Sequence, residues 1–270
     1  MTLRPPSPST TAVVTGASSG IGADIARELA RRGWGVTLVA RREERLKALA
    51  DELSTEHGVR SEVVAADLSD AASRQAMVDE ISARGLDVDI LVNNAGFGTG
   101  GAVHEADRDA EVSMIRTNVE ALADLTYVYV PQMVGRGSGA VLNVASTAAF
   151  QPLPGSATYA ATKAFVLRLT EAMHEELKGT GVTVTALCPG PVRTPFVDII
   201  SKGESESVGS MPSFMWMDSD EVAKAGVDGM LRGRRVVVPG RLNQLGALAG
   251  TFTPREILLP VMRRFWPFGD

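Results

Sequence analysis

The sequence is poor in the residues that build metal sites and disulfides. It has one cysteine, Cys188, and three histidines, His57, His104 and His174, among its 270 residues. A single cysteine excludes an internal disulfide framework and fits a reducing compartment. At the end of a predicted strand, Cys188 is expected to be a small buried filler. The histidines share no ligand spacing, so the sequence predicts no metal site.

Long apolar runs and an excess of basic residues are also missing. No apolar run approaches the ~18 residues that a membrane-spanning helix needs. Residues 1–10, rich in proline and serine, lack the apolar core of a secretory signal. The formal net charge of −5 argues against a nucleic-acid-binding surface. We therefore expect a cytoplasmic protein that begins with a disordered tail over residues 1–10.

Short apolar segments rich in β-branched residues alternate with segments of helical spacing along most of the chain. This alternation is typical of βαβ units around a parallel sheet. Strands are expected at residues 11–15, 35–39, 61–65, 88–92, 141–145, 182–187 and 234–238. Helices are expected at residues 23–32, 43–57, 70–84, 107–132, 157–173 and 219–231.

A glycine-rich loop joins the first strand to the first helix. It contains Gly16, Gly20 and Gly22, with the spacing G-x-x-x-G-x-G. Glycines there permit a tight turn and a close approach of backbone to a pyrophosphate, and the helix N-terminus supplies N–H donors. A purely structural turn is the alternative, but the position after the first strand of a βαβ unit favours nucleotide binding.

The second strand ends in residues that discriminate between nicotinamide cofactors. An acidic residue at this place accepts from the 2′-hydroxyl of NAD, whereas an arginine accommodates the 2′-phosphate of NADP. Here Ala40 is followed by Arg41 and Arg42. Cations are unfavourable at a helix start, so we favour NADP(H) over NAD(H), with Arg41 as the main contact and Arg42 as its support. The alternative is a solvated helix end.

Polar residues follow the next two strands, where ligands bind in open α/β sheets. Asp67 could accept from an adenine amino group, or it could cap the helix at 70–84 in competition with Ser69 and Asp70. The run Asn93-Asn94-Ala95-Gly96 suits cofactor contact through its backbone, or it is a simple turn. Asn118 lies in the middle of the helix expected at 107–132, and a buried asparagine there either distorts the helix or binds water at a site.

Tyr159 and Lys163 lie four residues apart on the helix at 157–173 and therefore share one face. A cation beside a phenol favours the phenolate and lowers its pKa, which yields a general acid/base. Ser146 ends the fifth strand thirteen residues earlier, so the three side chains can converge. Taken alone, Tyr-x-x-x-Lys also occurs by chance on many helices.

The end of the chain carries weaker patterns. Residues 195–217 include Met211, Phe214, Met215 and Trp216 and could form a lid over an apolar substrate, or an irregular surface loop. The extension at residues 241–270 mixes apolar and basic residues. It is expected to pack on its own or a neighbouring subunit, and membrane contact is the alternative.

Taken together, these motifs resemble those of the classical short-chain dehydrogenases/reductases. The resemblance spans residues 11–238 and includes Thr15-Gly16-x-x-x-Gly20-x-Gly22, Asn93-Asn94-Ala95-Gly96, Asn118, Ser146, Tyr159-x-x-x-Lys163 and Pro189-Gly190. It implies a single α/β Rossmann domain over residues 11–240, with a doubly wound, seven-stranded parallel sheet and helices on both faces. It also implies a homodimer or homotetramer.

The resemblance further assigns roles to residues. It implies a catalytic tetrad of Asn118, Ser146, Tyr159 and Lys163, in which Ser146 orients the carbonyl and Asn118 serves a proton relay. Lys163 lowers the pKa of Tyr159 and binds ribose. The expected cofactor contacts are Gly16, Ser18, Ser19, Gly20, Ile21, Gly22, Arg41, Arg42, Asp67, Leu68, Asn94, Ala95, Gly96, Tyr159, Lys163, Pro189, Gly190, Val192 and Thr194.

The expected activity is NADPH-dependent reduction of a ketone or aldehyde, on an apolar small molecule, with the cofactor carrying the chemistry. One alternative is an NAD-dependent alcohol dehydrogenase, which the lack of an acidic residue at Ala40 disfavours. The other is a non-catalytic NADP-binding sensor or scaffold. Fold alone does not distinguish it from an enzyme, but the intact tetrad disfavours it.

Overall fold

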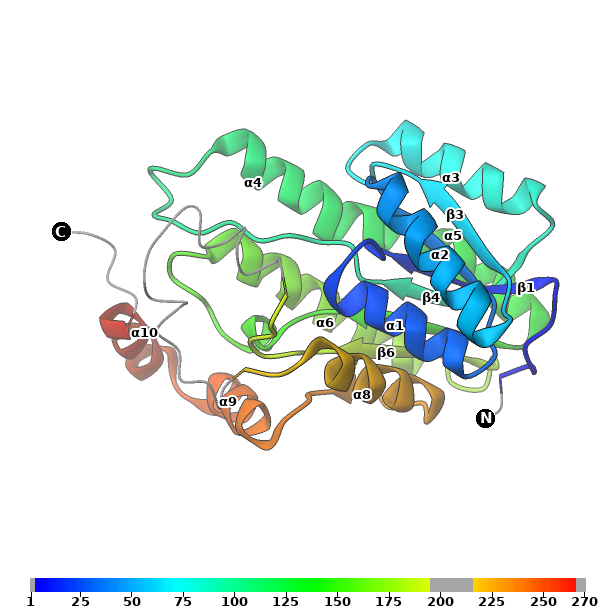
Figure 1. The fold of residues 1–270 in the computed structure, drawn as a ribbon. Coiled ribbons are helices and arrows are strands. Elements are labelled where there is room, and N and C mark those ends of the chain that lie inside the picture. Colours follow the sequence, from blue (N-terminus) through cyan, green and yellow to red (C-terminus); the bar gives the residue numbers. More distant parts are fainter. Residues whose placement is uncertain (1–2, 195–215, 266–270) are drawn as a thin grey trace.

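Seven parallel strands form the centre of the molecule (Figure 1). The computed structural model describes residues 3–194 and 216–265. The strand order is β3-β2-β1-β4-β5-β6-β7, so the chain runs outward from β1 to one edge and returns beside β1 to run to the other. The strands are β1 Thr10–Thr15, β2 Val36–Ala40, β3 Ser61–Ala65, β4 Asp87–Asn93, β5 Gly139–Val144, β6 Val182–Leu187 and β7 Val236–Val237.

Helices cover both faces of this sheet (Figure 1), which explains why β1 and β5 are buried along their whole length. One apolar core joins the sheet to α1 Gly20–Arg31, α2 Glu43–His57 and α8 Ser219–Leu231. A second core on the other face joins it to α3 Ala71–Ala83, α5 Ala121–Arg136 and α6 Ala157–Glu176. The predicted doubly wound Rossmann fold is confirmed.

The long helix predicted at residues 107–132 is interrupted where Asn118 lies. It consists of α4 Arg108–Ile115, a π-helical turn Arg116–Glu120 (η1), and α5. Asn118 is buried inside this turn. Of the two outcomes expected for a buried asparagine, the structure shows the distorted helix. Such π turns occur frequently at functional sites.

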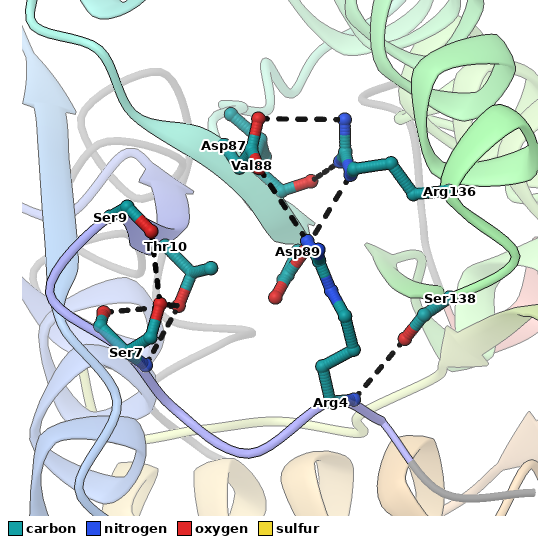
Figure 2. Close-up of polar contacts among 9 residues, drawn as sticks. All are labelled: Arg4, Ser7, Ser9, Thr10, Asp87, Val88, Asp89, Arg136 and Ser138. Atoms are coloured by element: carbon teal, nitrogen blue, oxygen red, sulfur yellow. Dashed lines mark hydrogen bonds and ion pairs between the residues drawn. The ribbon is translucent and has the colours of Figure 1, made fainter.

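The sequence predicts a disordered tail over residues 1–10, but the structure places residues 3–9 against the amino ends of the strands (Figure 2). The Arg4 guanidinium lies 2.5 Å from Oδ1 of the fully buried Asp89, and the Arg4 N–H donates to the Ser138 hydroxyl at 3.2 Å. Thr10 already belongs to β1. The structure thus pairs Arg4 with a buried carboxylate on β4, and the disordered tail stays a prediction.

Two helices follow β7, α9 Arg241–Phe252 and α10 Arg255–Phe265. α9 packs through small residues, since a Cβ on Gly250 would lie 2.7 Å from the side-chain oxygen of Gln151. Its large apolar side chains face outward, and Phe252 is 78% exposed. Residues 195–215, which make up most of the predicted lid, lie outside the described residues. None of the helices described is long and apolar enough to cross a membrane.

Candidate active site

Ser146 and Tyr159 meet at the carboxyl end of β5. Ser146 precedes a short 3-10 turn, Thr147–Phe150 (η2), and its hydroxyl accepts from the Ala148 N–H at 3.1 Å. Tyr159 lies in the first turn of α6 and is hydrogen-bonded to Ser146. Desolvation of the phenol raises the pKa of Tyr159 to about 12, against which the hydrogen bond to Ser146 acts. At neutral pH, Tyr159 is therefore a protonated acid in contact with a hydroxyl.

Lys163 is buried one turn further along α6. Its ammonium donates to the Val144 carbonyl at 2.9 Å and lies 5.8 Å from the centroid of the Tyr159 ring. Burial lowers the pKa of Lys163 to about 8. The raised pKa of Tyr159 arises from desolvation of the phenol, and the Lys163 ammonium donates to a backbone carbonyl. That Lys163 lowers the pKa of Tyr159 stays a prediction.

Two neighbours complete this part of the site. Burial raises the pKa of the Cys188 thiol to about 12, so Cys188 is an unreactive filler, as predicted. A Cβ on Gly96 would lie 2.8 Å from Oδ1 of Asn118 and 3.5 Å from Nζ of Lys163. The glycine thus allows Asn118 and Lys163 to approach the same point of the backbone.

Asn118 is held by hydrogen bonds on both sides of its amide. Its Nδ2 donates to the Phe97 carbonyl at 2.9 Å and to the Thr162 hydroxyl at 3.1 Å. Its Oδ1 accepts from the Phe97 N–H at 3.1 Å. Because both amide hydrogens are used, the second lone pair of Oδ1 is the side-chain position through which Asn118 could contact a water.

The glycine loop adopts the conformation that the sequence predicts. Gly16 and Gly20 have φ of 66° and 58°, where a side chain is strained. A Cβ on Gly22 would lie 2.5 Å from the Gly16 carbonyl oxygen. Asn94 donates through Nδ2 to the Thr15 carbonyl at 2.9 Å, so the loop is tied to the end of β4. The side chain of Asn94 therefore braces the loop.

Arg42 and Arg41 diverge at the end of β2. Arg42 reaches over the glycine loop and donates to the hydroxyls of Ser18 and Ser19 at 2.7 and 2.8 Å. Hydrogen bonds from Ser69 lower the pKa of Asp67, and the positive charge of Arg41 lowers it further. The helix α3 is capped by Asp70, not by Asp67.

The segment that follows β6 lies beside both η2 and the glycine loop. Pro189 accepts from the Thr147 N–H at 2.9 Å. A Cβ on Gly20 would lie 3.1 Å from the Thr194 methyl group, so this segment touches the glycine loop. The structure thus brings the predicted residues of three strand ends together. The glycine cradle, the N-terminus of α1 and two arginines fit the phosphates of a dinucleotide.

Two further residues of the site were not predicted. Arg45, one turn after Arg41 and Arg42 on α2, lines a cavity of about 410 Å³ together with Ser18 and Ser19. The third arginine of the stretch Arg41-Arg42-Glu43-Glu44-Arg45 was the signal that could have found it. Thr162 contacts Asn118, and no spacing in the sequence points to that contact.

This chain is similar to known proteins. The family model described as short chain dehydrogenase matches residues 10–205. The chain belongs to the short-chain dehydrogenase family. A sulfoacetaldehyde reductase of Chromohalobacter salexigens is 38% identical over 194 residues, 71% of this chain and 76% of that protein. An NADP-dependent 3-hydroxy acid dehydrogenase of Salmonella typhi is 38% identical over 199 residues, 73% and 79% of the two chains.

A solved structure agrees with these relatives. A short-chain dehydrogenase from Sphingobium yanoikuyae in complex with NADPH is 36% identical, with a TM-score of 0.79 over 93% of this chain and 95% of that one. Family membership confirms the resemblance read from the motifs. The chain is accordingly an oxidoreductase that acts on CH–OH and C=O groups.

Proposed function

We propose that this enzyme reduces a ketone or aldehyde to an alcohol with NADPH. The observation that carries the proposal is the hydrogen bond between Ser146 and Tyr159, with the buried Lys163 on the next turn of the same helix. In a short-chain dehydrogenase such a hydroxyl and phenol would both contact the carbonyl oxygen of the substrate, and the phenol would give it a proton. When bound, the cofactor supplies the hydride.

The raised pKa of Tyr159 suits the reductive direction. A phenol with a pKa of about 12 stays protonated at neutral pH and can donate its proton to a developing alkoxide. Ser146 would hold the substrate oxygen against the phenol. As the proton leaves, the Lys163 ammonium stabilises the negative charge on the phenolate, at a ring distance of 5.8 Å.

Asn118 and Lys163 would return the proton to Tyr159. Oδ1 of Asn118 and Nζ of Lys163 both lie beside Gly96, so one water could contact both groups. We therefore assign Asn118 to a proton relay that ends at Tyr159.

The remaining predicted residues would hold the cofactor. The glycine loop and the N-terminus of α1 would bind the pyrophosphate, and Lys163 would also bind the nicotinamide ribose. Arg41 and Arg42 would bind the 2′-phosphate, which favours NADP(H) over NAD(H). Asp67 would lie near adenine and Thr194 near the nicotinamide.

The substrate is proposed to be an apolar small molecule, on the basis of the Met- and aromatic-rich residues 211–216. Two relatives are named for small acidic substrates, so sulfoacetaldehyde and 3-hydroxy acids belong in the same screen. A homodimer or homotetramer is the proposed assembly.

The test combines a substrate screen with Tyr159→Phe. Wild-type protein should oxidise NADPH with at least one ketone or aldehyde. Tyr159→Phe should lower kcat by about 10²- to 10⁴-fold and leave the NADPH affinity within a few-fold. Turnover in the variant equal to wild type would refute Tyr159 as the acid. NADPH binding without turnover on any carbonyl would favour the scaffold alternative, and activity with NAD and alcohols alone would favour the alcohol dehydrogenase.

A further inference from the structure

The loop that follows β3 contains the residues proposed to lie near adenine, and two successive residues of α3 hold its backbone. The Ser73 hydroxyl accepts from the Asp67 N–H at 3.0 Å. The Arg74 guanidinium donates through Nη1 to the Leu68 carbonyl at 2.9 Å. The peptide groups on the two sides of the Asp67–Leu68 peptide are therefore both fixed by side chains of α3.

Arg74 is anchored to a second part of the fold. It is 3% exposed. Its Nε donates to the Asp124 carboxylate of α5 at 2.7 Å, and its Nη2 donates to the Glu120 carboxylate at the end of η1 at 2.5 Å. A guanidinium presents its donors in a rigid planar fork. Because two edges of the fork are held by these carboxylates, the direction in which Nη1 meets the Leu68 carbonyl is set as well.

The loop held in this way presents one acceptor and one donor. Both hydrogen bonds from Ser69 to the Asp67 carboxylate end at Oδ1, at 2.9 and 2.7 Å. Within residues 3–194 and 216–265, Oδ2 of Asp67 and the N–H of Leu68 have no hydrogen-bond partner. An acceptor beside a donor complements the Watson–Crick edge of adenine, where an amino group stands next to the accepting nitrogen N1.

The Leu68 N–H belongs to the peptide between the two that α3 fixes. A peptide group is planar and turns as a unit, so release of the Leu68 carbonyl lets the neighbouring peptide rotate. The N–H would then lose its alignment with the carboxylate of Asp67. Arg74 thus controls the direction of a donor that lies two bonds away from its own contact.

We propose that Arg74 is a positioning residue for the adenine of the cofactor: by holding the Leu68 carbonyl, it keeps the Leu68 N–H and the Asp67 carboxylate directed at the same base. This inference rests on the proposed NADPH-dependent function and adds to it a residue that sets the specificity for the base. Arg74 is buried and acts through the backbone of Leu68.

The other end of α3 offers a matched control. Arg84 caps the C-terminus of this helix. It donates to the Val63 carbonyl at 3.1 Å, to the Glu62 carboxylate at 2.5 Å and to the Glu80 carboxylate. The set of partners, one carbonyl and two carboxylates, is the same as for Arg74. Val63, however, lies within β3 and not in the loop at its carboxyl end.

The experiment titrates NADPH and its hypoxanthine analogue into wild-type protein, Arg74→Lys and Arg84→Lys by calorimetry. Hypoxanthine has an accepting oxygen in place of the amino group and a donor at N1, so it opposes both groups of the loop. Wild-type protein should prefer NADPH by about tenfold, as expected when a polar group is left unpaired.

Lysine keeps the charge of Arg74 but cannot hold three acceptors in one plane. Arg74→Lys should therefore weaken NADPH binding by about 5- to 10-fold, the equivalent of one hydrogen bond. Binding of the analogue should change less than about twofold, so most of the preference for adenine is lost. The KM for NADPH should rise, whereas kcat at saturating NADPH should stay within about threefold of wild type.

Arg84→Lys should keep the preference for NADPH over the analogue within about twofold of wild type, whatever its loss of melting temperature. A purely structural role of Arg74 lowers the melting temperature and leaves this preference unchanged. Equal losses of NADPH and analogue affinity in Arg74→Lys would overturn the proposal, as would equal losses of preference in the two variants.

Asp124→Ala provides a second variant in case Arg74→Lys does not fold. It removes a half-exposed carboxylate and releases one edge of the guanidinium, while Arg74 itself stays in place. The preference for NADPH over the analogue should fall by about two- to threefold. An unchanged preference in this variant would contradict the proposal.

The two proposals fail in different ways. A wild-type preference for NADPH over the analogue that persists in Arg74→Lys would refute the positioning role and leave the reductase mechanism intact. Equal affinity of wild-type protein for NADPH and the analogue would refute recognition of adenine by this loop, and the role of Arg74 with it. No binding of NADPH to wild-type protein would refute the proposed function itself.

Discussion

The buried charged side chains at the two ends of the central strands have different kinds of partner. At the amino end, the buried Asp89 of β4 is paired with Arg4, and Arg136 lies nearby at 3.9 Å (Figure 2). At the carboxyl end, the Lys163 ammonium is buried against a backbone carbonyl and has its pKa lowered to about 8. The first arrangement ties the chain together. The second costs stability and places a buried cation 5.8 Å from the centroid of the Tyr159 ring.

The largest expected effect of this contrast is on turnover at the carboxyl end. Lys163→Met should lower kcat by about 10²- to 10⁴-fold, because the phenolate loses its cation. The free energy of unfolding at pH 7 should not fall, since a desolvated charge is replaced by an apolar side chain of similar length. Steady-state assays and urea unfolding measure the two effects. If Lys163→Met kept its kcat and lost stability, Lys163 would serve the fold and not the chemistry.

At the amino end of the strands we expect a loss of stability without a loss of turnover. Asp89→Ala should lower the free energy of unfolding by about 2 kcal/mol, because the hydrogen bond from Arg4 to a fully buried carboxylate is lost, although Arg4 keeps Asp87 at 3.7 Å. Asp87→Ala serves as the control. Asp87 is half exposed and lies 3.7 Å from Arg4, so its loss should cost less than ~1 kcal/mol. Turnover per folded molecule should stay near wild type in both, and a large loss of kcat in Asp89→Ala would break the separation.

The pH dependence of stability gives a smaller and more specific effect. The pKa of Lys163 is about 8 in the folded protein and 10.5 in the unfolded chain. The unfolded state therefore binds more protons between these values, and stability rises as pH increases through this window. From pH 8 to pH 10 the gain should be about 2 kcal/mol relative to Lys163→Met. A flat difference between the two proteins would show that Lys163 is not desolvated.

Much of this arrangement follows from local sequence. The expected bounds of α2, β3, β6 and α8 agree with the structure residue by residue, because period and end signals there are both strong. The glycine loop, Ser146 and the Tyr159–Lys163 pair are also brought together as predicted, since parallel strands deliver their carboxyl ends to one edge.

What the sequence does not predict depends on contacts between distant residues. Arg4 meets Asp89 across 85 positions of the chain, and a tail rich in proline and serine gives no sign of that partner. The raised pKa of Tyr159 comes from desolvation of the phenol, which spacing along a helix does not reveal. The contact of Thr162 with Asn118 spans 44 positions and needs both helices in place.

The central claim, a reductase that uses NADPH, is tested most directly by calorimetric titration of NADPH and NADH into the protein and its Arg41→Ala and Arg42→Ala variants. The account predicts that NADPH binds more tightly than NADH. Each variant should lose about tenfold of that preference, the equivalent of about 1.4 kcal/mol, without losing NADH affinity. Equal affinity for both cofactors, or a preference for NADH that the variants leave unchanged, would contradict it.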